Sequence, residues 1–410
     1  MTPTARTIAK SLPRTALALA LVGSAAAADA IQVTTASGAS ATLYGIAQFD
    51  ASWENHRGIS APGNLVYYAD IGKAAQSGEW NLTAMNSRLG VNFTGPDSGK
   101  AYKLGGKIEF DFGSTAAYVE NQPVVRLRLG YGTLAFPGIG LSFLAGQAAD
   151  VFSPLVAPTI NTGGLWFGGN VGYRRPQFRV TEAVPVGSAR VEVAAAVARS
   201  IGSAGYMGQT DGGHDADIPA FEGRAAVSLP LWVEKQNATL GFSGHFGQED
   251  VMIKDTLVPK DTGIYKTLNS WSINADLELP LVSFLSLVAE ADYGANLDAY
   301  MGGINQGFTK VLIGTDSSAK NVVGFGGWFA LRLKAGSSIV GNIGLGVDSV
   351  HSSTVSKNKP VRNTNAFVNT SYFLAPNSRI GIELERIETD YKAAHYQRLW
   401  RTQAVYAYSF

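Results

Sequence analysis

The amino-acid sequence predicts an all-β protein, a transmembrane antiparallel β-barrel of sixteen strands. Apolar and polar residues alternate with a period of two along most of the chain, which is typical of strands with one apolar face. The connections between these alternating segments are short and long in turn. After the N-terminal region, no stretch supplies the roughly 18 uncharged apolar residues that a membrane-spanning helix requires.

The composition of the 410 residues excludes several classes of function. Lys and Arg number 33 against 32 Asp and Glu, with no block of bases, so we expect no nucleic-acid partner. The chain has no cysteine, which excludes disulfides, thiolate metal sites and thiol catalysis. We expect no cofactor.

The N-terminal residues have the pattern of a secretory signal peptide. Three basic residues precede an apolar run and an alanine-rich site of the A-x-A type. We expect cleavage after Ala28, with Ala30 as the alternative. The predicted organisation is therefore a signal peptide, residues 1–28, and one outer-membrane barrel domain, residues 29–410, whose strands begin near residue 41.

The strand pattern is clearest between Tyr102 and Phe112. Even positions there are apolar or glycine, while four of the five odd positions are charged. The same alternation predicts sixteen strands at about 41–53, 82–93, 101–113, 122–135, 139–147, 173–183, 189–201, 220–229, 238–247, 269–279, 284–294, 321–334, 337–349, 363–374, 378–389 and 398–410.

The connections after even-numbered strands are tight, as in the Pro-containing turn at residues 136–138. Connections after odd-numbered strands include the longest ones. Short turns at one rim and long loops at the other are typical of outer-membrane barrels. The longest connections are residues 54–81, 148–172, 202–219, 248–268 and 295–320.

The two faces of the strands fit a barrel whose apolar side faces lipid. Small and aliphatic side chains alone could not fill the interior of a soluble sixteen-stranded circle. With the pattern reversed, apolar residues contact outer-membrane lipid and charged residues line a wet lumen, and closure leaves no unpaired edge. The last strand agrees, because Trp400, Tyr406, Tyr408 and Phe410 share one parity.

Several short segments resemble a known family. Residues 42–45, 86–90 and 105–111 resemble the first three strands of Gram-negative porins of the trimeric, sixteen-stranded superfamily. Further segments resemble the dicarboxylate-type branch of those porins. They are residues 126–132, 144–147 and 170–176.

This resemblance implies a water-filled channel for passive diffusion of small hydrophilic solutes. It also implies a homotrimer, a third loop that folds into the barrel at residues 148–172, and recognition of the terminal Phe410 by the barrel-assembly machinery. Small residues on the lipid-facing parity would let neighbouring walls approach closely. They are Gly45, Ala47, Ala51 and Gly106.

Charges on the inward parity predict a selective constriction. Strands two to eight carry mostly bases, whereas the first strand and strands nine to sixteen carry mostly acids. We expect a preference for small organic anions, since five arginines face a loop with Asp150 as its one acid. In the alternative interpretation, these charges pair with neighbours and are screened. The basic side is Arg88, Arg126, Arg128, Arg175 and Arg179, and the remaining constriction residues are Lys107, Glu109, Asp111 and Asp150. The acidic wall is Asp50, Asp276, Glu278, Glu290, Asp292, Asp348, Glu383 and Glu385.

Other functions have less support in the sequence. The five histidines show no catalytic spacing to a serine or carboxylate, so we expect no enzyme, although an outer-membrane lipase stays open as an alternative. Residues 211–217 include three aspartates that could bind a divalent cation, or form a solvated loop. A structural or adhesive barrel whose loops bind a partner is the alternative to a channel.

Overall fold

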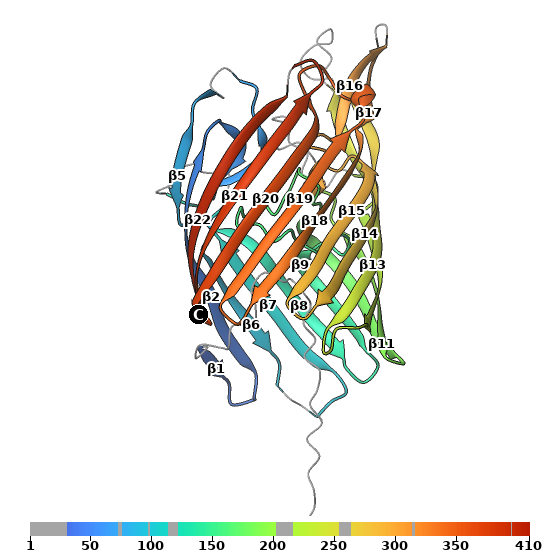
Figure 1. Cartoon of the computed structure of the whole chain (residues 1–410). Helices are drawn as coiled ribbons and strands as arrows, with labels where there is room; N and C mark the ends of the chain where they lie inside the picture. The colour runs from blue at the N-terminus through green and yellow to red at the C-terminus, as the bar shows by residue number, and fades with distance from the viewer. Residues whose placement is uncertain are drawn as a thin grey trace, which may run out of the picture.

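The computed structural model describes residues 31–72, 76–96, 99–113, 122–201, 216–253, 264–313, 316–394 and 396–410. The expected signal peptide and most of the loop at 211–217 lie outside these residues. Within them, the chain forms one closed antiparallel barrel of tilted strands (Figure 1).

The strands follow one another around the wall in chain order, each antiparallel to its neighbours. They are β2 (Ser40–Glu54), β5 (Glu79–Thr83), β6 (Arg88–Thr94), β7 (Lys103–Asp111), β8 (Arg126–Phe136), β9 (Leu141–Ala149), β10 (Arg174–Val186), β11 (Ala189–Ala198), β12 (Ala220–Pro230), β13 (Asn237–Ile253), β14 (Ile264–Val282), β15 (Leu285–Ala295), β18 (Val323–Ala335), β19 (Ile339–Val350), β20 (Pro360–Ala375), β21 (Ser378–Tyr391) and β22 (Gln397–Ser409).

The prediction of sixteen strands is confirmed. In the described residues, β5 and β6 pair with successive halves of β2 and so make a single interrupted strand, which gives 16 strands around the barrel. The last strand, β22, pairs with β2 from Ile46 to Glu54 and closes the circle. Phe410 completes this seam, because its backbone N–H donates to the Gly45 carbonyl at 3.1 Å.

The two faces of the wall differ as the alternation predicts. On β21, the outward Ile382 is 53% exposed and Leu384 is 43% exposed, whereas the inward Glu383 is 1% exposed. Large apolar side chains therefore form the outer surface, and polar side chains line the inside. This distribution is the one expected of a barrel surrounded by lipid.

The tight turns are built by residues suited to positive φ. Gly140 ends the turn before β9 with φ +73°, and a Cβ there would lie 2.2 Å from the Ala183 carbonyl oxygen. Only glycine fits this approach of β9 to β10. The turn between β20 and β21 lies at the same rim as the C-terminus, since Ser378 pairs with Tyr408.

The structure adds elements in segments that we expected to be irregular. Hairpins form in two of the long connections, and a short strand precedes the barrel. None of the helices in the described part of the chain has the length and apolar composition of a membrane-spanning segment. The added elements are β1 (Gln32–Thr34), β3 (Gly58–Ala61), β4 (Leu65–Ala69), β16 (Phe308–Ile313), β17 (Asp316–Asn321) and the short 3-10 helices η2 (Asp298–Tyr300) and η3 (Ser352–Thr354).

Candidate functional site

A basic wall lies on the inner face of β6, β7, β8 and β10, and part of it is paired. Arg126 donates from Nε and Nη2 to the two carboxylate oxygens of Asp111, at 2.9 and 2.8 Å. Arg128 bridges two acids, with 2.8 Å from Nε to Glu109 and 2.8 Å from Nη1 to Asp111. Bidentate pairs of this kind fix the guanidinium plane. The alternative interpretation of paired lumen charges therefore holds for these two arginines.

Four further cations of the wall have no such partner. Among the described residues, no carboxylate oxygen lies within 4.0 Å of the charged nitrogens of these side chains. Arg88 experiences the charges of Arg128 and Arg174 together with those of Glu109 and Asp111. Arg179 donates to the neutral Gln177 at 2.8 Å. The four are Arg88, Lys107, Arg174 and Arg179.

Two of these cations make cation–π contacts with aromatic rings. Lys107 Nζ lies 4.6 Å from the centre of the Tyr44 ring, and the guanidinium of Arg174 lies 4.4 Å from the Tyr173 ring. A ring face attracts a cation without neutralising its charge. Six cations and two carboxylates thus share this wall, which carries a net excess of positive charge.

The structure corrects the expectation for Arg175. Its side chain is 0% exposed and donates to Asp150 at 2.7 Å, so it does not face the open lumen. Glu222 lies 3.7 Å away on the same guanidinium, which is also 3.7 Å from the ring centre of Tyr300. Burial raises the pKa of Tyr300 above its usual range, and the nearby Arg175 opposes this shift. Asp150 is therefore already neutralised by Arg175 and does not stand opposite the other arginines.

The acids expected on the opposite wall have a different use. Glu383 accepts hydrogen bonds from the backbone N–H groups of Ile160 and Asn161, at 2.7 and 2.8 Å. Glu290 accepts from the backbone of Leu155 at 2.8 Å. Of the eight acids expected to form an exposed wall, all except Glu278 are buried. The expectation of an acidic wall on the lumen is therefore wrong for these seven buried residues.

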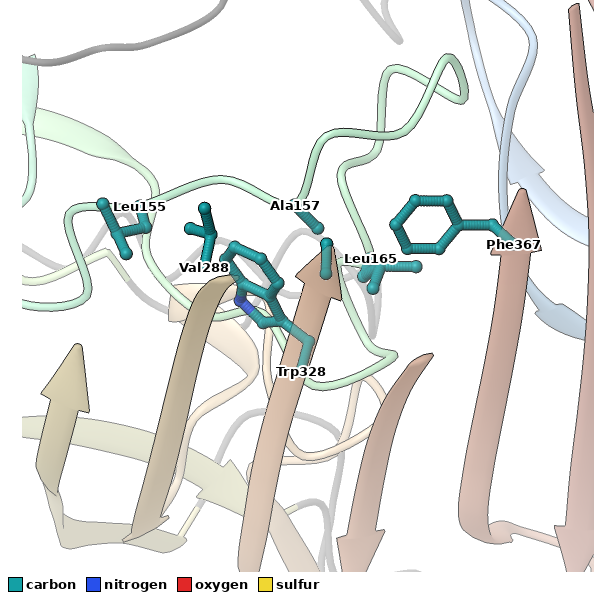
Figure 2. Close-up of a cluster of buried hydrophobic side chains, with 7 residues drawn as sticks. Leu155, Ala157, Leu165, Val288, Trp328 and Phe367 are labelled. Atoms are coloured by element: carbon teal, nitrogen blue, oxygen red, sulfur yellow. The ribbon is translucent and has the colours of Figure 1, made fainter. Parts of the chain in front are cut away.

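The backbone donors of these hydrogen bonds belong to the segment at residues 150–172, here named the docked segment. Its apolar side chains pack on inward-facing apolar residues of β15, β18 and β20 (Figure 2). The cluster contains Leu155, Ala157 and Leu165 from the docked segment, with Val288, Trp328, Ala330 and Phe367 from the strands. The docked segment is thus held to the inner face by hydrogen bonds and by apolar contact.

A second connection, residues 296–307, interlocks with the docked segment. Gly172 donates its backbone N–H to the Tyr300 carbonyl at 2.7 Å, and Phe167 donates to Met301 at 2.9 Å. Asp348 on β19 accepts from the backbone of Ile304 at 3.0 Å. The sequence predicts this segment only as part of the long connection at 295–320. Alternation gives Arg174 a lipid-facing position, yet its guanidinium lies near the inward-facing Arg128, Arg126 and Asp111.

No protein-family model and no curated protein matches the sequence. Solved structures do match the fold. The outer membrane channel DcaP of Acinetobacter baumannii has a TM-score of 0.70 and 17% identity, over 92% of this chain and 99% of that chain. The anion-selective porin of Comamonas acidovorans has a TM-score of 0.56 and 12% identity, over 91% of this chain and 100% of that chain.

A trimer form of OmpT, an outer membrane protein of Vibrio cholerae, has a TM-score of 0.53 and 9% identity, over 91% of this chain and 99% of that chain. At these identities the likeness concerns the fold. The chain has the sixteen-stranded barrel fold of the outer-membrane porins.

Proposed function

We propose that this protein is an outer-membrane porin, a water-filled channel for passive diffusion of small hydrophilic solutes with a preference for small organic anions. The observation that carries this proposal is the excess of cations on the inner wall, above all the unpaired Arg88, Arg174 and Arg179. The similar fold of a porin named anion-selective supports it.

The mechanism is electrostatic guidance through a narrowed pore. We infer that the docked segment reduces the cross-section, because it lies against the inner face on the side remote from β8. Solutes then pass close to the basic wall. Arginine stays charged at any working pH and binds carboxylates, so neighbouring guanidiniums can pass an anion along. Each contact across a wet pore contributes about 1 kcal/mol or less, so selectivity is modest and weakens with salt.

Reversal potentials in a KCl gradient test the anion preference. For the purified wild type in planar bilayers, we expect a chloride-to-potassium permeability ratio above one that falls as the mean salt concentration rises. The double variant Arg88→Gln with Arg179→Gln should lower this ratio. The control is Arg386→Gln. Arg386 lies on the outward face of β21, so this variant removes a charge without changing the lumen.

Three outcomes contradict the proposal. Cation preference in the wild type, or the same ratio in the double variant, would mean that the basic wall does not select ions. A protein that inserts but does not conduct would favour the alternative, a structural or adhesive barrel whose loops bind a partner.

We further propose a homotrimer, as in the trimer form of the similar barrel. A depression of about 680 Å³ lies on the outer wall over β6 to β9, where Gly106, Gly130 and Gly132 leave the surface low. A second copy could approach closely there. Gly45 does not contribute to such an interface, because the ring of Phe410 covers it. Native mass spectrometry should show trimers for the wild type and fewer for Gly106→Trp.

A further inference from the structure

The connection at residues 296–307 contains two buried side chains with unused hydrogen-bonding atoms. Asn296 is 0% exposed, and neither its Oδ1 nor its Nδ2 has a hydrogen-bond partner among the described residues. Asp298 is 6% exposed, and its Oδ1 also has none. A buried carboxylate oxygen without a hydrogen-bond partner destabilises the fold, because it has lost its water and gained nothing in return. A bound cation would remove this cost.

The two unused oxygens converge on the same point. A Cβ placed on Gly307 would lie 2.2 Å from Asn296 Oδ1 and 2.3 Å from Asp298 Oδ1, so the oxygens are at most 4.5 Å apart. Because residue 307 is glycine, no Cβ occupies the point that both oxygens face. In the described part of the chain, no Lys, Arg or His nitrogen lies within 4.0 Å of the Asp298 carboxylate.

We propose that Asp298 Oδ1 and Asn296 Oδ1 bind a hard divalent cation, with Ca²⁺ as the first candidate, in the space beside Gly307. Carboxylate and amide oxygens are the ligands that Ca²⁺ prefers, at 2.3–2.6 Å. Two oxygens fill a small part of its coordination shell, so water completes it. We therefore expect weak binding, with a dissociation constant of about 0.1–1 mM, as in extracellular calcium modules.

The cation would stabilise the part of the chain that holds the docked segment. Tyr300 and Met301 lie two and three residues after Asp298, and their carbonyls accept the two hydrogen bonds from Gly172 and Phe167. A cation on Asp298 fixes the start of this connection and thereby these contacts. A cation at this site would make the contact between the two connections more rigid whichever solutes pass through the barrel.

Calorimetric titration tests the site directly. Protein refolded free of lipopolysaccharide and treated with EDTA should bind one Ca²⁺ per chain. Asp298→Asn should weaken binding at least tenfold, and Gly307→Ala should do the same, because its Cβ enters the site while the carboxylate stays. Asp70→Asn removes a carboxylate from another connection and should bind like the wild type. Absence of Ca²⁺ binding by the wild type, or binding by both site variants that is as tight as that of the wild type, overturns the proposal.

Hydrogen exchange of the wild type gives a second test that needs no variant. With Ca²⁺ present, peptides covering residues 296–307 should exchange more slowly than with EDTA, by a factor of about 3 or more. Unchanged exchange there, or protection only elsewhere, overturns the site. If Asp298→Asn raises the thermal midpoint while Ca²⁺ has no effect on the wild type, the group satisfying the oxygen is a proton, and the proposal is wrong.

Discussion

Replacing Glu383 by Gln should release the docked segment from the wall. The Glu383 carboxylate accepts three N–H donors, from the backbones of Ile160 and Asn161 and from the Asn369 amide at 2.8 Å. The Gln amide offers one oxygen in place of two, so at least one buried donor loses its acceptor. The remaining hydrogen bonds also lose their charge assistance.

The size of the effect follows from these contacts. A hydrogen bond to a charged group contributes about 1.5–3 kcal/mol, and a neutral one about 1 kcal/mol. We therefore expect docking to weaken by about 3 kcal/mol, which raises the undocked population on the order of 100-fold.

Single-channel recordings and hydrogen exchange measure this change. Glu383→Gln should show more current noise, or brief high-conductance events, and faster exchange of the backbone near Ile160. Glu278→Gln removes a carboxylate from β14 that makes no hydrogen bond to the docked segment in the described residues and serves as the control. If both variants behave alike, or if exchange near Ile160 is unchanged, then Glu383 does not anchor the segment.

Three other outcomes are expected. Gly45→Val should prevent barrel closure, since a Cβ at this position would lie 2.4 Å from the Phe410 ring and 2.8 Å from the Arg88 carbonyl oxygen. The variant should lose the heat-modifiable gel mobility of a folded barrel, and normal mobility would contradict this. Trp328→Ala should destabilise the barrel by about 3–5 kcal/mol through the cavity that it leaves, seen as a lower thermal midpoint, whereas an unchanged midpoint would show that the ring is not packed. Mass spectrometry of the exported protein should place its first residue at Asp29, directly after Ala28, and an uncleaved chain would rule out the signal peptide.

The strands were predictable because alternation is a local property. A residue facing lipid must be apolar whichever strand lies beside it. Each strand can therefore be recognised from its own ten or so residues. The break between β5 and β6 was not predictable, since Asn86 within the break binds Asp50 and the carbonyl of Gly63, which are distant in sequence. The hairpin of β3 and β4 was not predictable either, because the irregular register of its pairing disturbs the alternation of apolar and polar residues.

The basic wall was predictable only in part. Parity correctly placed Arg126 and Arg128 on the inner face, yet it could not tell that they pair with Glu109 and Asp111. The alternation along β10 also predicted that Arg175 faces the lumen. Nothing in the local sequence indicates that a loop residue covers this side chain. Whether an inward charge stays exposed depends on which loop docks over it, and this is decided by contacts across the barrel.

The anchoring of the docked segment has a consequence for the order of assembly. The hydrogen bond from Ile160 to Glu383 joins residues 223 positions apart, so the segment emerges long before its acceptor does. Until β21 has joined the wall, the backbone at Ile160 has no carboxylate to bind. The apolar side chains of the docked segment also lack part of the wall on which they pack. Docking of this segment on Glu383 is therefore a late step of assembly, completed only after β21 has joined the barrel.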